Sequence, residues 1–110
     1  MKLDNKICTP CKSGTPPLGE AEANALLKEI PSWSFKEGHL WRSFRFKKFT
    51  DAIEFVNSVA RLAEEEGHHP NITIRYNKVE LELWTHAVKG LSENDFILAS
   101  KIDSLTGGGT

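Results

Sequence analysis

The chain has 110 residues, of which 39% are hydrophobic and 26% charged, and its formal net charge is −1. This length predicts one domain, the charged fraction is typical of globular rather than disordered proteins, and the near-zero charge argues against a dedicated nucleic-acid binder. No apolar run approaches the roughly 18 residues of a membrane span, and the first six residues lack the apolar core of a secretory signal. We therefore expect a small cytoplasmic domain that contacts no membrane.

The two ends of the chain predict flexible segments. Residues 1–17 hold three of the five prolines and show no periodicity, and the tail 107–110 reads Gly-Gly-Gly-Thr, so one domain is expected to span 18–106. Cys8 and Cys11 form a single CxxC pair. A zinc ribbon needs two such pairs, and a thioredoxin-like redox site needs a strand before the pair and a helix after it. The pattern favours two thiols in a flexible arm, with metal or redox use as the alternatives.

The first half of the domain predicts a helix and a hairpin. An Ala- and Leu-rich helix spans 19–30 and ends before Pro31, which disfavours helix in the residue that precedes it. Two strands, 33–36 and 39–47, follow on either side of a turn at Glu37-Gly38. A two-residue turn there pairs Phe35 with Leu40 across the hairpin.

A long amphipathic helix comes next. Thr50 or Asp51 is expected to cap its start, and Gly67 is expected to end it in the left-handed conformation. Its predicted apolar stripe consists of Ala52, Val56, Val59, Ala60 and Ala63.

A second hairpin and a third helix complete the domain. The strands 71–76 and 79–85 flank Asn77-Lys78, so that Tyr76 is expected to face Val79. The last helix is expected to begin at Ser92, with Asp95 as the acidic partner of a capping box. Its predicted buried stripe is Leu98, Ala99, Ile102 and Leu105. The order α-β-β-α-β-β-α predicts an α+β two-layer sandwich, with the helices on one face of a four-stranded antiparallel sheet.

Three of the four histidines converge at the open end of the second hairpin in this register. His69 is expected to lie opposite His86, and His68 precedes them at the end of a helix, where the dipole favours a protonated imidazole. Imidazole changes charge close to neutral pH, so such a cluster suits proton transfer. Two alternatives remain, a solvated loop and a three-histidine zinc site, although adjacent histidines of an extended segment seldom aim at one ion.

Carboxylates lie near these histidines in the sequence. Glu64 is four residues before His68 and could tune that imidazole if the helix persists, whereas the run Glu64-Glu65-Glu66 is otherwise typical of a solvated helix end. Capping is a sufficient explanation of Asp95, and a site role for it must be argued from elsewhere.

Together these residues resemble the signature of the pterin-4a-carbinolamine dehydratases. The matching positions are Glu64, His68, His69, Pro70, Tyr76, His86 and Asp95. The resemblance extends to Trp33, the segment RFKKF, the turn YNKV and the run GLSENDFILAS, and so covers nearly all of 18–105.

The resemblance implies a reaction. Members of the family dehydrate 4a-hydroxytetrahydropterin, formed when aromatic amino acid hydroxylases use their pterin cofactor, to quinonoid dihydropterin and water, in tetrahydrobiopterin recycling. By this likeness His68, His69 and His86 are the catalytic residues. One imidazole would protonate the departing hydroxyl while another takes a proton from the adjacent ring nitrogen.

The resemblance also implies supporting residues and partners. Glu64 and Asp95 would orient or tune the site, and Pro70 and Thr85 would shape the pterin pocket. No metal or organic cofactor is expected, because the pterin is itself the substrate. A homodimer or homotetramer and a functional link to an aromatic amino acid hydroxylase are implied as well.

Two departures and one alternative function accompany the resemblance. Ala87-Val88 stands where animal relatives have more polar or thiol-bearing residues, and Asn94 stands where they have a basic residue. Because animal relatives also serve as dimerisation cofactors of a homeodomain transcription factor, a protein-interaction role is the alternative. The segment 42–48, RSFRFKK, interleaves bases with aromatics, but its alternation favours a strand with one buried and one solvated face over a nucleic-acid interface.

Overall fold

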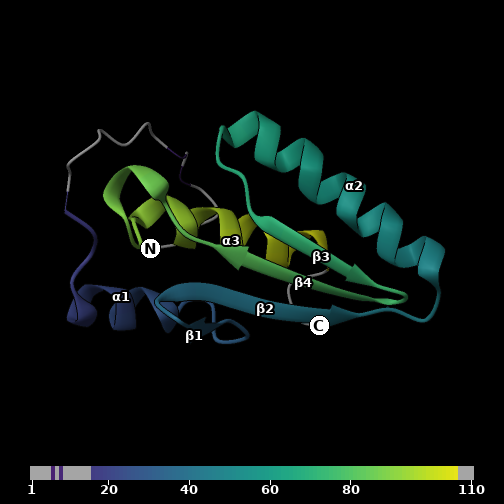
Figure 1. The fold of residues 1–110 in the computed structure, drawn as a ribbon, viewed down its shortest axis with the longest axis horizontal. Coiled ribbons are helices and arrows are strands. Elements are labelled where there is room, and N and C mark those ends of the chain that lie inside the picture. Colours follow the sequence, from purple (N-terminus) through teal and green to yellow (C-terminus); the bar gives the residue numbers. More distant parts are fainter. Residues whose placement is uncertain (1–5, 7, 9–15, 107–110) are drawn as a thin grey trace.

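The computed structural model describes Lys6, Cys8 and residues 16–106. Its helices are α1 (Glu20–Leu27), α2 (Phe49–Glu66) and α3 (Glu93–Leu105), and its strands are β1 (Ser34–Lys36), β2 (His39–Arg45), β3 (Asn71–Arg75) and β4 (Lys78–Leu83) (Figure 1). The predicted order α-β-β-α-β-β-α is confirmed. A short 3-10 helix that the sequence did not predict, η2 (His86–Val88), lies between β4 and α3.

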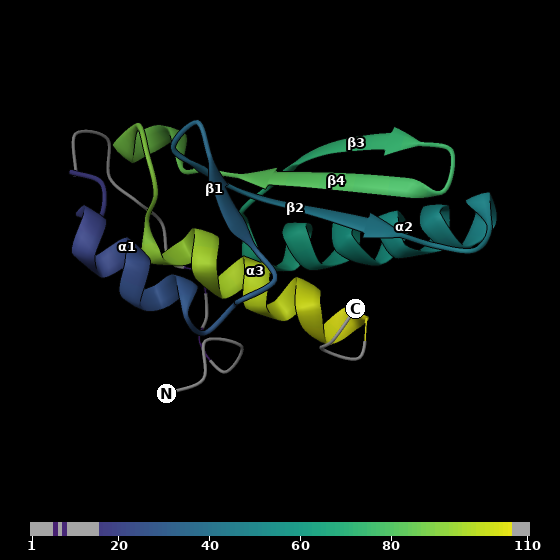
Figure 2. The same ribbon diagram turned by 90° about the horizontal axis from the view of Figure 1, so that it is seen from below.

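The four strands form one antiparallel sheet in the order β1-β2-β4-β3. All three helices lie on the same side of this sheet, as its edge-on view shows (Figure 2), so the predicted two-layer α+β sandwich is confirmed. Alternate residues of β2 and β4 are buried, among them Leu40, Leu81 and Leu83. The predicted pairing of Phe35 with Leu40 is also confirmed.

Helix α2 ends where its sequence predicts but begins earlier. Gly67 takes a φ of 66° after the last helical residue, and it is the C-cap expected there. At the other end Lys48 is the N-cap, so the expected caps Thr50 and Asp51 are wrong. Thr50 and Asp51 instead belong to the first turn, because Lys48 is the last extended residue and the helix begins at Phe49.

The buried face of α2 differs from the predicted stripe at three positions. The face comprises Ala52, Phe55, Val59 and Ala63. Phe55 was missed, Val56 is only half-buried, and Ala60 is exposed. A spacing of three and then four residues returns to the same side of a helix, so the large Phe55 directs the helix towards the sheet and turns Ala60 away from it.

The second hairpin turns one residue earlier than predicted. Tyr76 adopts a φ of 52°, Arg75 pairs with Lys78, and Asn71 at the start of β3 pairs with Glu82. The expected turn at Asn77-Lys78 is therefore wrong. Lys78 is instead part of β4, where it pairs with a residue of β2 on its other side.

Helix α3 begins as predicted and is buried along most of its length. Ser92 is the N-cap, and Leu98, Ala99 and Ile102 are buried, but Leu105 at the end of the helix is exposed. Leu105 lies in the last turn, where it lines an open hollow beside Phe46 and Phe55 and stays accessible to solvent, so its predicted burial is wrong.

Strand β2 places the side chain of one arginine in the core. Arg42 lies on the buried face, and its Nη1 donates to Asp103 Oδ1 of α3 at 2.5 Å. Trp33 Nε1 donates to the same oxygen at 2.8 Å. The segment 42–48 thus begins as the predicted alternating strand, and its first arginine is paired inside the protein.

The two described residues of the N-terminal segment lie against the domain. Lys6 Nζ lies 2.6 Å from Glu93 Oε2, and Cys8 is buried in the core cluster. At these two positions the chain contacts the folded domain, and the flexible arm expected for 1–17 stays a prediction. Cys11 and the tail 107–110 fall outside the described residues. Across the described part of the chain, the helices are too short or too polar to cross a membrane.

Candidate active site

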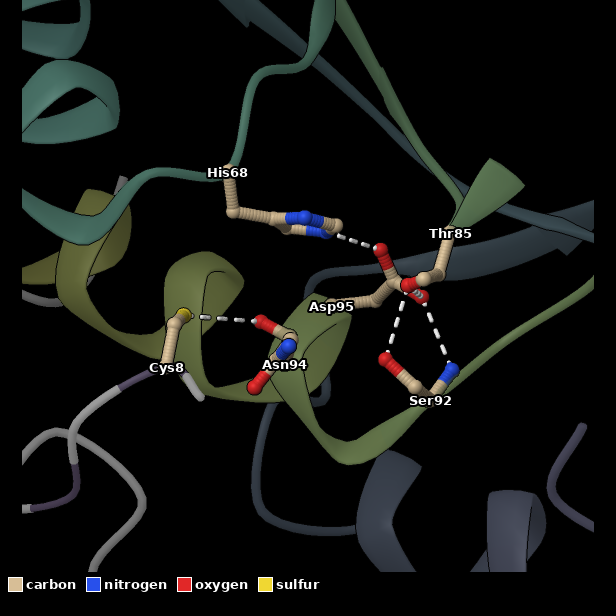
Figure 3. A network of polar contacts seen from close by, with 6 residues as sticks. All are labelled: Cys8, His68, Thr85, Ser92, Asn94 and Asp95. Carbon is tan, nitrogen blue, oxygen red and sulfur yellow. Dashed lines mark hydrogen bonds and ion pairs between the residues drawn. The ribbon is translucent and has the colours of Figure 1, made fainter. Parts of the chain in front are cut away.

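A buried carboxylate is the centre of the candidate site (Figure 3). Asp95 in the first turn of α3 is fully buried. Its Oδ2 accepts hydrogen bonds from the Ser92 backbone N–H and from Thr85 Oγ1, both at 2.9 Å. Its Oδ1 lies 2.6 Å from His68 Nε2. One carboxylate therefore joins the start of α3, the end of β4 and the loop after α2.

The local sequence explains why a carboxylate is stable there. The spacing Ser92-Glu-Asn-Asp95 places an acid at the third helical position, where it satisfies the free N–H of the cap residue. The positive end of the helix dipole also favours an anion at this point. The cap hydrogen bond from Ser92 therefore uses Oδ2, and Oδ1 remains available for the contact with His68.

His68 is held by this carboxylate at the end of α2. Its side chain is only 11% exposed, and its backbone N–H donates to the Ala63 carbonyl at 3.2 Å. The left-handed Gly67 turns the chain out of the helix immediately before it. An imidazole paired with a buried carboxylate keeps one ring nitrogen engaged and presents the ring in a fixed orientation.

Thr85 contacts this pair through Asp95, and Pro70 follows His68 by two residues in the sequence. Thr85 is buried, and its Oγ1 also lies 2.7 Å from Ser92 Oγ. A bridge between Thr85 and Gly90 closes the loop that contains η2. Pro70 is half-buried and directly precedes β3.

His69 pairs with Glu64, whereas His68 pairs with Asp95. Its Nε2 lies 2.5 Å from Glu64 Oε2, and the histidine side chain is 60% exposed. The expectation that Glu64 tunes His68 is therefore wrong. After Gly67 leaves the helix, it is His69 that lies over the last turn of α2, while His68 reaches Asp95.

His86 does not lie opposite His69 by strand pairing. It is exposed in η2, and its ring lies 4.6 Å from that of Trp84 at an interplanar angle of 50°. Because the hairpin turns one residue early, extending its register beyond Asn71 brings Trp84, rather than His86, opposite His69. The register from which the convergence was predicted is thus wrong.

Two further residues next to the site were missed by the sequence reading. Glu66 Oε1 accepts the Cys8 backbone N–H at 2.9 Å, and Glu66 Oε2 lies 2.8 Å from Lys101 Nζ. The Cys8 thiol lies 3.5 Å from the carbonyl oxygen of Asn94, the residue before Asp95 (Figure 3). A signal for Glu66 was present, because it follows Ala63 by three residues and so continues the buried stripe of α2.

Burial and hydrogen bonds change the acidity of these two groups. Burial works against the charged form of Glu66, but the hydrogen bonds from Cys8 and Lys101 outweigh it and lower the pKa of Glu66. Burial, and then the negative charge of Glu66, raise the pKa of the Cys8 thiol to about 12. Among the residues that the structure describes, no three His, Cys, Asp or Glu side chains are arranged to hold a metal ion.

Comparison with known proteins gives consistent matches over this domain. A family model described as pterin 4 alpha carbinolamine dehydratase matches residues 16–105. A protein of Cupriavidus pinatubonensis named as a pterin-4-alpha-carbinolamine dehydratase is 48% identical over 111 residues, which cover 99% of this chain and 96% of that protein. A protein of Rubrobacter xylanophilus with the same name is 46% identical, over 94% of this chain and 98% of its own.

A solved structure matches the fold as well. The crystal structure of a transcriptional coactivator/pterin dehydratase from Brucella melitensis superposes with a TM-score of 0.77 at 34% sequence identity. The match covers 81% of this chain and 97% of the Brucella chain.

Proposed function

The chain belongs to the pterin-4a-carbinolamine dehydratase family, and we propose that it catalyses the reaction for which that family is named. This is a hydro-lyase reaction on a 4a-hydroxytetrahydropterin, which yields quinonoid dihydropterin and water. The observation that carries the proposal beyond sequence likeness is the buried Asp95, which holds His68 on one oxygen and Thr85 on the other.

The reaction needs two proton transfers and no change of oxidation state. The bond between C4a and the hydroxyl oxygen breaks, and a proton delivered to that oxygen lets it leave as water. Loss of the proton on the adjacent N5 allows the C4a–N5 double bond to form. A general acid and a general base positioned at these two atoms are therefore what the enzyme must supply.

We assign these transfers to His68, His69 and His86. Asp95 and Thr85 support this assignment for His68, because they fix its ring in a largely buried position. Glu64 is assigned to orient His69, which is exposed enough to meet a ligand. Pro70 and Thr85 are assigned to the wall of the pterin pocket, and the pterin is the substrate, so the proposal includes no metal or further cofactor.

The direct test is dehydration of the carbinolamine by the wild type and by single alanine variants. Replacing His68, His69 or His86 is expected to lower kcat about 10²- to 10⁴-fold if each acts as an acid or base. Glu64→Ala is expected to lower it less, and Glu65→Ala, the neighbouring exposed carboxylate, serves as the matched control. Three fully active histidine variants would remove the catalytic assignment, and a wild type no faster than the spontaneous reaction would remove the enzyme function.

The substrate and partners follow from the same proposal. A carbinolamine of this kind is produced by aromatic amino acid hydroxylases, so a functional link to such an enzyme, in the cytoplasm, is part of it. The name of the Brucella protein includes a coactivator role, which makes a protein-interaction role the second candidate function here. An interaction module does not need the histidines, so binding to a partner that persists in His68→Ala would favour that role.

A further inference from the structure

The fourth histidine of the chain lies outside the proposed catalytic set but is connected to it through a tryptophan. The imidazole of His39 stacks on the Trp84 ring, with centroids 4.3 Å apart and planes 8° from parallel. The Trp84 ring in turn contacts the His86 imidazole at 4.6 Å. Glu82 completes the chain of contacts, because its Oε2 lies 2.7 Å from His39 Nδ1.

The sheet register explains why these four side chains meet. Leu40 of β2 pairs with Leu83 of β4, and both are buried on the helix side. Side chains alternate along a strand, so the neighbours His39 and Trp84 both project from the opposite, helix-free side. Glu82 is two residues before Trp84 and shares that side. His39 and Glu82 of this stack therefore belong to paired strands, whereas Trp84 directly follows the end of β4 and His86 lies in η2.

His86 is the member that needs support. It is exposed in a 3-10 helix of three residues, whereas its proposed role requires one imidazole orientation. Trp84 can supply that support, because it is half-buried and packs against the hydrophobic core. The aromatic contact limits the rotation of the His86 ring, and the contact with His39, itself bonded to Glu82, limits movement of the indole.

We propose that Trp84, supported by His39 and Glu82, is a positioning residue that fixes the imidazole of His86 at the mouth of the candidate site. This rests on the proposed function, because that function gives His86 its catalytic role. Trp84 acts through His86 and has no assigned contact with the reacting atoms. The family signature contains none of these three supporting residues.

The contact between Trp84 and His86 can be tested without an activity assay. The aromatic ring current of Trp84 shifts the NMR resonances of nearby imidazole protons, so the His86 ring protons are expected to move in Trp84→Leu and to stay close to their native position in Trp84→Phe. Trp41→Leu is the matched control, because Trp41 lies on the same side of the sheet and contacts Lys36 at 5.0 Å. Circular dichroism and thermal unfolding establish that each variant is folded.

Kinetics then test the positioning role. Loss of one orienting contact is expected to lower kcat for carbinolamine dehydration about three- to tenfold in Trp84→Leu, with KM changed less than kcat. His39→Gln is expected to give a smaller loss, Trp84→Phe to restore most of the rate, and Trp41→Leu to match the wild type.

The possible outcomes separate this inference from the proposed function. Unchanged His86 resonances in Trp84→Leu overturn the positioning contact, whatever the activity. An unchanged kcat in Trp84→Leu, with an active wild type and an impaired His86→Ala, overturns the positioning role. An inactive wild type overturns the proposed function instead, and the contact of Trp84 with His86 then has no role in catalysis.

Discussion

A single carboxylate, Asp95, both caps a helix and contacts a histidine, and the sequence pattern alone accounts for the cap. Its cap hydrogen bond to Ser92 follows from local spacing, and a sequence reading can predict it. Its pairing with His68, which lies 27 residues earlier in the chain, depends on how α2 and α3 pack. The family resemblance, and not the spacing, was the signal that assigned Asp95 to the site.

Asp95→Asn separates these functions. An amide can still accept from Ser92 and Thr85, but it lacks the charge that pairs with His68. We expect kcat to fall about 10- to 100-fold and the free energy of unfolding to fall by about 1.5–3 kcal/mol, the usual contribution of a hydrogen bond to a charged group. Dehydration assays and urea unfolding measure both. Asp51→Asn, which changes an exposed acid in the first turn of α2, should alter neither, and native kcat in Asp95→Asn would contradict the role of the pair.

The Cys8 thiol is expected to be unreactive in the folded protein. Burial and the adjacent Glu66 raise its pKa to about 12, so at pH 8 only roughly one molecule in ten thousand carries the reactive thiolate. A Cys11→Ser variant leaves Cys8 as the remaining cysteine of the chain. Its reaction with a thiol reagent such as dithiobis-nitrobenzoate should be slow in buffer and fast in denaturant. Fast reaction of the native variant would show that Cys8 is not buried in solution.

At the scale of the elements, the position of His68 relative to Asp95 depends on the contact between α2 and α3. Glu66 and Lys101 form an ion pair across these two helices, with 10% and 18% of their side chains exposed. Glu66 is the last residue of α2, two before His68, and Lys101 lies on the helix that begins with the turn containing Asp95. The same ion pair therefore fixes the end of α2 next to the site.

Removing this ion pair should change the pH dependence of stability. The folded-state pKa of Glu66 lies below its ordinary value of 4.5, so its contribution is present above about pH 4.5 and is lost as the pH falls through the lowered value. Glu66→Gln is expected to lose about 1–3 kcal/mol at neutral pH. As the pH falls, the unfolding free energies of Glu66→Gln and the wild type should converge. Urea unfolding at roughly pH 3 to 7 measures this, because the range covers most of the titration of a carboxyl group such as Glu66.

Glu65→Gln is the control for that experiment, because Glu65 is the exposed neighbour of Glu66 on the same helix. A constant difference between Glu66→Gln and the wild type at every pH would mean that the ionised carboxylate of Glu66 does not stabilise the fold.

Element types and order followed from the sequence, whereas the register of the second hairpin did not. Hydrophobic alternation fixes which side of a strand is buried, and a slip of two positions in the pairing preserves it. The turn residues decide the register. Asn77-Lys78 is a reasonable turn pair, but Tyr76 takes the left-handed conformation instead, which a residue with a large side chain seldom does. The alternation of β4 buries Leu81 and Leu83 in either register, while the predicted neighbour of His69 was wrong.

At the scale of the whole molecule, contacts between distant segments were the least predictable. Arg42, Trp33 and Asp103 meet in the core although no local pattern relates them. Burial outweighs the hydrogen bonds from Trp33 and Arg42 and raises the pKa of Asp103. Likewise, nothing in the N-terminal segment indicates that Cys8 packs against α3. Composition and periodicity describe elements one at a time, so they are silent about such contacts.

The exposed edges of the sheet suggest where copies of the chain would associate. β1 has three residues and β3 has five, and Ile74 of β3 is 40% exposed. Phe49 and Tyr76, both exposed, stack on each other at the end of the hairpin beyond β3. An edge strand with exposed apolar side chains favours pairing with another chain. We therefore expect β3, rather than β1, to form the interface of the proposed homodimer or to contribute to that of a homotetramer.

Ile74→Lys tests this expectation, because a charge on an edge strand opposes its association. Sedimentation or light scattering should find the wild type as a dimer or tetramer and the variant shifted towards monomer, with little change in far-ultraviolet circular dichroism. Phe35→Lys makes the same change at the other edge, at a side chain of nearly equal exposure, 39%, and should leave the assembly intact. Dissociation by Phe35→Lys alone would place the interface at β1. A monomeric wild type at every concentration would remove the oligomer from the proposal.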